Sequence, residues 1–382
     1  MQRLATISDP RSTAPVVPFL DLTKVNEPVR EQVFAGLERL FESNAFTNGP
    51  DVGVFEEAFA AYVGSRHCVG VASGLDGIRL ALLAVGLERG DEVIVPASTF
   101  VAAFEAVTQA GGVPVVVDVG EADYCIDTER VADAMTRRTR AIVPVHLYGQ
   151  VADLRALTQI AADGGVHVIE DAAQAHGASR DGVGAGRAST AAAWSFYPGK
   201  NLGALGDAGA VTTDDPDVAA TLRALREHGQ RAKYDSVMEG YTARLDTIQA
   251  IALTAKLAHL DAGNAERRAV AAAYTGALDG VGELRLPEVP DGSEPVWHLY
   301  VVRTTDPVAL AQHLADAKIG TGRHYPVPPH LSGAYAFLGH PEGSFPVTEA
   351  LSRECLSLPI FPGMTDEQVQ HVCASVQAFF RG

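Results

Sequence analysis

Cysteine is scarce in this sequence: only four of the 382 residues are cysteines, and none lies close to another. This spacing excludes a paired-cysteine metal or redox motif, so we expect no metal site and four buried, reduced thiols. Long apolar runs are also missing, since none approaches the ~18 residues that a membrane-spanning helix needs. The first twenty residues lack the apolar core of a secretory signal. We therefore expect a cytoplasmic protein that contacts no membrane.

Basic residues are outnumbered, with 30 Lys and Arg against 47 Asp and Glu, for a net charge of −17. Such a surface would repel a phosphate backbone, so we expect no nucleic-acid partner. An anionic small molecule would need a local basic patch. Hydrophobic residues make up 47% and charged residues 20% of the chain, which is typical of folded globular proteins and excludes global disorder.

Short apolar runs alternate with amphipathic segments between residues 66 and 213. The runs do not alternate polar and apolar side chains, which is typical of strands buried on both faces. We therefore predict an α/β fold, a parallel sheet covered by helices, with strands at 68–72, 92–96, 113–119, 141–149, 166–171, 193–196 and 209–212. Alanine and leucine dominate residues 214–275, which predicts helices there. Prolines and a further apolar run follow after about residue 280, and this change in composition predicts a second, smaller α+β unit.

Candidate binding residues fall at the carboxyl ends of these predicted strands, where α/β sheets bind ligands. Ser73, Gly74 and Leu75 turn a strand directly into a helix, and exposed amides at a helix N-terminus favour an anion. An ordinary helix cap explains the same residues. Phe100 begins a helix after another strand and could stack on a planar ligand, although ordinary core packing is the simpler interpretation.

Two further strand ends carry ionisable groups. Glu170 and Asp171 end one strand, and because neighbouring strand residues point to opposite faces, only one of them can face a given ligand. A helix cap or a core ion pair is the simpler alternative. Lys200 lies in the turn 197–203 between two apolar strands, where a desolvated lysine has a lowered pKa and can bond to an aldehyde.

Taken together, an anion-binding turn, a carboxylate, a reactive lysine and an aromatic ring are the parts that pyridoxal 5'-phosphate (PLP) requires. The lysine holds the aldehyde, and the carboxylate keeps the pyridine nitrogen protonated, which makes the ring an electron sink. The sequence therefore predicts a PLP site.

Five stretches of the sequence resemble the DegT-type family of PLP-dependent nucleotide-sugar aminotransferases. They are GVASGLDGIRLAL (70–82), PVHLYGQ (144–150), EDAAQAHGA (170–178), WSFYPGKNLGALGDAGAV (194–211) and RLDTIQA (244–250). The resemblance implies a fold-type I large domain, like that of aspartate aminotransferase, with a mostly parallel sheet. We assign it to 1–260 and a small C-terminal domain to 261–382. It also implies a homodimer with active sites at the interface.

The resemblance also implies roles for individual residues. Lys200 would bond to PLP and shuttle the proton, and Asp171, rather than Glu170, would hold the pyridine nitrogen. Gln174 would contact the ring hydroxyl, Phe100 would stack on the ring, and Ser195 would join Ser73, Gly74 and Leu75 at the phosphate. Thr242 stands where relatives usually carry an asparagine that reaches the partner subunit's phosphate, and Leu75 stands where many carry threonine.

The run FYPGKNLGA (196–204) resembles the branch that aminates the 3-keto position of dTDP-linked 6-deoxyhexoses. This implies transfer from an amino acid such as glutamate to a keto nucleotide sugar, in amino-deoxysugar and antibiotic biosynthesis. Arg226, Arg231 and Lys233 are predicted to clamp the pyrophosphate, with a solvated loop as the alternative. Tyr197, His324 and Tyr325 are predicted to line the sugar pocket, although 324–330 is equally well explained as a structural turn.

Other functions remain open at this point. A 4-keto-sugar or cyclitol aminotransferase would carry the same cofactor residues. A PLP-dependent sugar dehydratase shares the fold, but the known type replaces the lysine, so Lys200 argues against it. A catalytically silent regulator is disfavoured by Lys200, Asp171 and Gln174 together. The sequence does not specify the sugar, the nucleotide base or the stereochemistry of the product.

Overall fold

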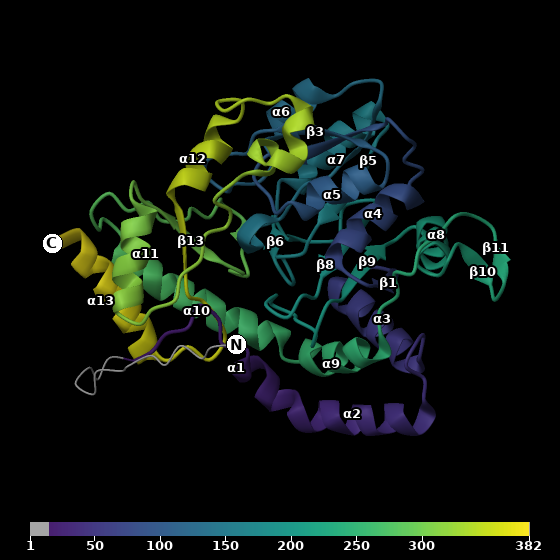
Figure 1. Cartoon of the computed structure of the whole chain (residues 1–382), viewed down its shortest axis with the longest axis horizontal. Coiled ribbons are helices and arrows are strands. Elements are labelled where there is room, and N and C mark those ends of the chain that lie inside the picture. The colour runs from purple at the N-terminus through teal and green to yellow at the C-terminus, as the bar shows by residue number, and fades with distance from the viewer. Residues whose placement is uncertain (1–14, 382) are drawn as a thin grey trace.

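The structure, a computed structural model, describes residues 15–381 and contains a large and a small unit (Figure 1). The large unit is built on a seven-stranded sheet with the order β1-β9-β8-β5-β4-β2-β3. Its strands are β1 (His67–Val71), β2 (Glu92–Pro96), β3 (Val113–Val117), β4 (Thr139–Ile142), β5 (His167–Asp171), β8 (Ala191–Ser195) and β9 (Gly209–Thr213). Six strands lie within two residues of their predicted runs at each end and β4 overlaps its run only at 141–142, so the α/β prediction is confirmed.

The direction of one strand differs from the expectation of a parallel sheet. β9 is antiparallel to both β1 and β8, whereas the β5–β8, β4–β5, β2–β4 and β2–β3 pairs are parallel. The short link from β8 to β9 explains this, because no crossover helix separates the two strands and a parallel pair needs one. The sheet is mixed but mostly parallel.

β4 is also shorter than the predicted run 141–149. It ends at Ile142, and a 3-10 turn occupies Leu147–Gly149. Two residues in the run explain why the strand is not longer. Pro144 has no amide hydrogen to give to a ladder, and Tyr148 adopts a left-handed backbone with φ of 60°.

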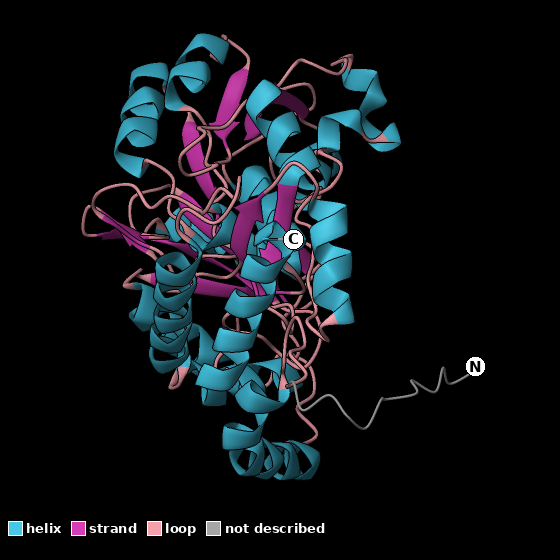
Figure 2. Cartoon of the chain, turned by 90° about the vertical axis from the view of Figure 1, so that its left-hand side faces the viewer, coloured by secondary structure: helices cyan, strands magenta, loops and turns pink. Residues whose placement is uncertain are grey.

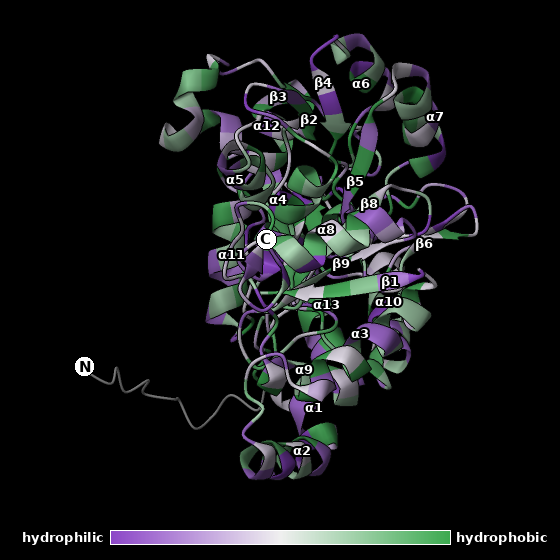
Figure 3. Ribbon diagram, turned by 90° about the vertical axis from the view of Figure 1, so that its right-hand side faces the viewer, coloured by the Kyte–Doolittle hydropathy of each residue, from purple (hydrophilic) through white to green (hydrophobic). Residues whose placement is uncertain are grey.

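The sheet is buried on both faces, as the continuous apolar runs predicted. On one face, Ala193 of β8 packs with residues of α4 (Gly74–Ala84), α5 (Ala102–Gln109) and α8 (Pro216–Arg226). On the other, its neighbour Trp194 packs with residues of α3 (Pro50–Val63) and α9 (Thr247–Leu257). Helices α6 (Thr128–Ala134) and α7 (Leu154–Gly164) cover β3, β4 and β5. Figures 2 and 3 show the helices around the sheet and the apolar interior.

The small unit has its own apolar core. β13 (Tyr300–Arg303) pairs antiparallel with β14 (Cys355–Leu358), and α10 (Leu260–Leu278), α11 (Pro307–Asp316) and α13 (Asp366–Arg381) pack around them. Val17 belongs to this core too, so the N-terminal end of the described chain returns to the small unit. The boundary at 260/261 stays a prediction. It falls at the first residue of α10, and the N-terminal segment with Val17 lies outside it.

The remaining elements are peripheral. They are α1 (Thr23–Asn26), η1 (Glu27–Val29), α2 (Arg30–Ser43), β6 (Ser179–Arg180), β7 (Val183–Gly184), β10 (Gln230–Ala232), β11 (Asp235–Ser236), β12 (Ser293–Glu294), η3 (Pro329–Leu331), η4 (Gly333–Leu338) and α12 (Pro346–Glu354). Of these, α2 runs along α9 at the lower edge of Figure 1, and the β10–β11 hairpin projects to the right.

All four cysteines are buried and free. Over residues 15–381, no helix is both long and apolar enough to cross a membrane. The prediction about a secretory signal concerns the first twenty residues, of which 1–14 lie outside the described part of the chain.

Candidate active site

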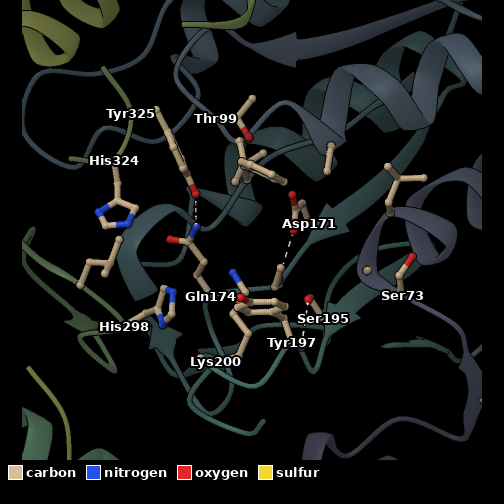
Figure 4. Close-up of a pocket in the computed structure, with 18 of the residues that line it drawn as sticks. Ser73, Thr99, Asp171, Gln174, Ser195, Tyr197, Lys200, His298, His324 and Tyr325 are labelled. Atoms are coloured by element: carbon tan, nitrogen blue, oxygen red, sulfur yellow. Dashed lines mark hydrogen bonds between the residues drawn. The ribbon is translucent and has the colours of Figure 1, made fainter. Parts of the chain in front are cut away.

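A cavity of about 580 Å³ lies at the carboxyl ends of β1, β2, β5 and β8, where the small unit meets the sheet (Figure 4). Both units contribute to its wall, and so does the N-terminal segment through Phe19 and Leu20. The structure brings eleven of the residues singled out from the sequence to this cavity: Ser73, Gly74, Leu75, Phe100, Asp171, Gln174, Ser195, Tyr197, Lys200, His324 and Tyr325.

The turn from β1 into α4 forms one end of the cavity. Ser73 caps α4, since its Oγ accepts a hydrogen bond from Asp76 N (3.1 Å), and Gly77 N donates to Ser73 O (3.0 Å). The amides of Gly74 and Leu75 precede this first closed turn and are available to an anion. A Cβ at Gly74 would lie 2.6 Å from Ser195 Cβ, so only glycine allows the two strand ends to approach this closely.

Asp171 ends β5 and faces the cavity. It is 8% exposed and accepts a hydrogen bond from Ala173 N (3.1 Å), and no cation of the described residues lies within ion-pair distance of it. Burial raises the pKa of the Asp171 carboxyl, and the nearby Lys200 ammonium opposes that rise. A buried carboxylate without a cationic partner is suited to receive a protonated ring nitrogen.

Glu170 points to the opposite face of β5, as strand alternation predicts. It is fully buried, and its Oε2 lies 2.7 Å from His146 Nε2 and accepts a hydrogen bond from Gly186 N (2.7 Å). It does not line the cavity. Only Asp171 of the two acids can therefore meet a ligand there, as expected from the sequence.

Lys200 lies in the turn after β8, and its side chain extends into the cavity (Figure 4). Two backbone hydrogen bonds shape the turn, from Lys200 N to Tyr197 O and from Ala204 N to Phe196 O, each 2.8 Å. Burial lowers the pKa of the Lys200 ammonium to about 8, although the Asp171 carboxylate pulls it upward. Lys200 therefore holds a larger share of neutral, nucleophilic amine at neutral pH than an ordinary lysine.

Two hydrogen bonds hold the Gln174 amide in one orientation, one from the large unit and one to the small unit. Its Oε1 accepts a hydrogen bond from Tyr148 N (2.7 Å), and its Nε2 donates to Tyr325 Oη (3.3 Å). Phe100 is 53% exposed, and its ring centroid lies 5.5 Å from that of Tyr325. An aromatic ring left this exposed beside a cavity is available to stack on a planar ligand.

The sequence reasoning missed several cavity residues, among them Thr99, Arg267 and His298. Arg267 Nη1 donates to main-chain oxygens of Trp297 (3.2 Å) and Ile360 (2.8 Å), and burial lowers the pKa of this guanidinium to about 10. Thr99 follows a predicted strand end and could have been found by that signal. Arg267 and His298 could not, because they come from distant parts of the chain.

Four predicted site residues do not line the cavity of their own chain. Arg226 is held inside the large unit, where it pairs with Glu56 (2.5 Å) and donates to Gly70 O (2.7 Å). Arg231 and Lys233 lie on the exposed β10–β11 hairpin. Thr242 lies beside this hairpin, with its Oγ1 3.2 Å from His228 Nε2.

The residues of the cavity fit PLP. Asp171 offers a buried carboxylate without a cation, Lys200 an amine with a lowered pKa, and the glycine at position 74 a close approach that a Cβ would fill. Lys200 would hold the aldehyde carbon, Asp171 the ring nitrogen, and the β1–α4 turn with Ser195 the phosphate.

Comparisons with known proteins agree with the resemblance seen in the sequence. The model of the DegT/DnrJ/EryC1/StrS aminotransferase family matches residues 28–377. The dTDP-3-amino-3,4,6-trideoxy-alpha-D-glucose transaminase of Streptomyces venezuelae is 47% identical over 367 residues, 96% of this chain and 97% of that protein. The erythromycin biosynthesis sensory transduction protein EryC1 of Saccharopolyspora erythraea is 48% identical over 362 residues, 95% of this chain and 99% of that protein.

The fold also matches solved structures. The crystal structure of S. venezuelae DesV in complex with a ketimine intermediate has a TM-score of 0.95 and 46% identity, and the match covers 97% of this chain and 100% of that one.

Proposed function

Because the chain belongs to the DegT/DnrJ/EryC1/StrS aminotransferase family, we propose that it uses PLP to move an amino group from an amino acid, such as glutamate, to a keto nucleotide sugar. The observation that carries this proposal is the convergence of Lys200, Asp171 and the β1–α4 turn on one cavity. Each lies where one functional group of PLP needs a partner.

Each residue has a defined task in this proposal. Bound PLP would supply an electron sink through its ring and would hold the amino group between the two half-reactions. Lys200 Nζ would take a proton from the substrate carbon that bears the amino group, as a general base, and would then return a proton as a general acid. Asp171 would hold the ring nitrogen with its carboxylate, and the Gly74 and Leu75 amides would bind the phosphate. Phe100 and Gln174 would contact the ring and its hydroxyl.

We propose a dTDP-linked 3-keto-6-deoxyhexose as the acceptor. The run 196–204 around Lys200 supports this substrate, and so does the 3-amino sugar product named for the S. venezuelae transaminase. Tyr197, His324 and Tyr325 line the cavity and would contact the sugar. A 4-keto sugar is the alternative within the same family.

The proposal includes a homodimer with shared active sites. Exposed apolar side chains on α2 and α9 support it, because Phe34, Phe41 and Ile248 are 55%, 69% and 38% exposed. In such a dimer, Arg231, Lys233 and Thr242 would serve the partner's cavity, with the first two at the pyrophosphate and Thr242 at the PLP phosphate. We also propose a cytoplasmic location, which the four free, buried cysteines support.

A regulatory role is the second candidate, favoured by one observation: the 48% identical relative is named as a sensory transduction protein. The two functions are separable, because a regulator needs no turnover.

The experiment that tests the proposal incubates the purified protein with PLP, glutamate and a panel of 3-keto and 4-keto dTDP-sugars. Product mass and NMR then locate the new amine. We expect a 3-amino sugar and two separable half-reactions, the pattern of a ping-pong enzyme. The Lys200→Ala variant is the control and should form no product. Product from that variant would refute the role of Lys200, and PLP binding without turnover of any sugar would favour the regulator.

A further inference from the structure

A chain of amide side chains connects the buried interior to the cavity. Asn264, which is 2% exposed, donates from Nδ2 to His176 O (2.8 Å). Its Oδ1 therefore faces Asn201 and accepts a hydrogen bond from Asn201 Nδ2 (2.9 Å). The same Nδ2 also donates to Val296 O (3.0 Å). Because a main-chain oxygen can only accept, these two anchors fix which way both amides point.

The orientation of Asn201 determines the tautomer of His298. Asn201 Oδ1 lies 3.1 Å from His298 Nδ1. An amide oxygen only accepts, so His298 Nδ1 must carry the hydrogen. Burial, together with the nearby Lys200 and Arg267 cations, holds the pKa of His298 well below its usual range, so the ring is neutral and has one N–H. Its Nε2 is therefore a hydrogen-bond acceptor and cannot donate.

This acceptor faces the cavity. His298 lines it together with Lys200 (Figure 4). Among the described residues, no protein group forms a hydrogen bond with His298 Nε2. The atom is also not one of the fully buried polar atoms that lack a partner, so solvent or a ligand can reach it. A ligand that fills the cavity must satisfy this nitrogen with a donor or leave a desolvated acceptor without a partner.

The charges around His298 select the kind of donor. Lys200 and Arg267 both place positive charge near the ring, which opposes a second ammonium at Nε2. A neutral hydroxyl has no such penalty and is the donor that a sugar offers. The amino donor, whose reacting group is an ammonium in water, fits this position less well.

We propose that His298 Nε2 is a specificity-determining acceptor for a hydroxyl beside the keto carbon of the sugar. This inference rests on the proposed function, since it names a contact of the same substrate. His298 transfers no proton in it. The hydroxyl donates to Nε2, and the Asn201–Asn264 pair keeps that nitrogen free of hydrogen.

Two substitutions of His298 separate its two nitrogens. His298→Asn keeps a donor near Nδ1 for Asn201 but removes the acceptor from the cavity, whereas His298→Gln can return an amide oxygen near Nε2. His259→Asn, at an exposed histidine outside the cavity, is the matched control. Each variant is assayed with two keto sugars that differ only in the neighbouring hydroxyl, and the glutamate half-reaction is measured separately.

We expect His298→Asn to lose about tenfold in kcat/KM for the hydroxylated sugar, the range of one neutral hydrogen bond, and to leave the deoxy analogue and the glutamate half-reaction unchanged. His298→Gln should recover part of the loss, and His259→Asn should behave as wild type. Equal losses on both sugars, or a loss confined to the glutamate half-reaction, would overturn the inference.

Imidazole ¹⁵N chemical shifts test the tautomer without turnover. We expect His298 Nε2 to be unprotonated at neutral pH in the wild-type holoenzyme, and a protonated Nε2 would overturn the inference. The two proposals fail in different ways. If the wild-type protein aminates no nucleotide sugar, the proposed function fails. If His298→Asn keeps the wild-type ratio of kcat/KM between the two sugars, only the role of His298 fails.

Discussion

The lowered pKa of Lys200 can be measured directly in the cofactor-free protein. The pKa falls from 10.5 to about 8 because the ammonium is buried. Since each pKa unit changes the ratio of amine to ammonium tenfold, Lys200 should hold about 300 times more neutral amine at pH 7 than an ordinary lysine. Its reaction with an amine-selective acylating reagent should rise with pH and level off above about 8.

The assay uses less acylating reagent than there are lysines, and mass spectrometry of the peptides gives the extent of acylation at each lysine as a function of pH. Lys233, on the exposed hairpin, is the internal reference. Asp171→Asn supplies a second test of direction. The Asp171 carboxylate stabilises the charged form of Lys200, so its loss should move the midpoint of Lys200 below 8.

Two results would refute this reasoning. One is a Lys200 midpoint that coincides with that of Lys233, which would mean that water reaches the amine freely. The other is an upward shift in Asp171→Asn, which would mean that the carboxylate does not face the amine.

Three further changes test other parts of the account. Asp171→Asn should slow the glutamate half-reaction, measured by stopped flow, by about 100-fold or more, because a preorganised charge is lost. Glu170→Gln should leave that rate unchanged and lower the free energy of unfolding in urea by about 1–3 kcal/mol. Equal rate losses in the two variants would contradict the different roles of the two acids. Gly74→Ala should weaken PLP binding about tenfold or more, because the added Cβ would lie 2.6 Å from a side-chain atom; an unchanged dissociation constant in a fluorescence titration would argue against this turn as the phosphate site. Thr212→Val should lower stability by about 1–3 kcal/mol, since the buried Trp194 indole loses its acceptor at 2.9 Å; an unchanged Tm would count against that bond.

Local signals in the sequence sufficed for the parts of the site that follow strand ends. Asp171 ends an apolar run, and Gly74 and Lys200 follow one within four residues. The carboxyl ends of such strands lie at one edge of a sheet. The seven strands were predictable for the same reason. Their directions were not, because an apolar run carries no information about direction, and β9 is antiparallel.

The contributions of the small unit could not be predicted locally. His298 lies at the cavity beside Asn201, to which it is hydrogen-bonded and which stands 97 residues earlier in the chain. Arg226 illustrates the opposite case. It looked like part of a basic loop, but α8 extends to Arg226 and turns the side chain inward to Glu56. Such pairings depend on tertiary packing, which spacing in the sequence does not encode.

The central claim is that Lys200 bonds to PLP. Borohydride reduction of the PLP-loaded protein, followed by peptide mass mapping, tests it most directly. Lys256 provides a demanding comparison, because burial also lowers its pKa to about 8 while its Nζ donates to Gly203 O (2.7 Å). The account predicts reduced cofactor on Lys200 alone, and cofactor on Lys256 or on any other lysine would contradict it.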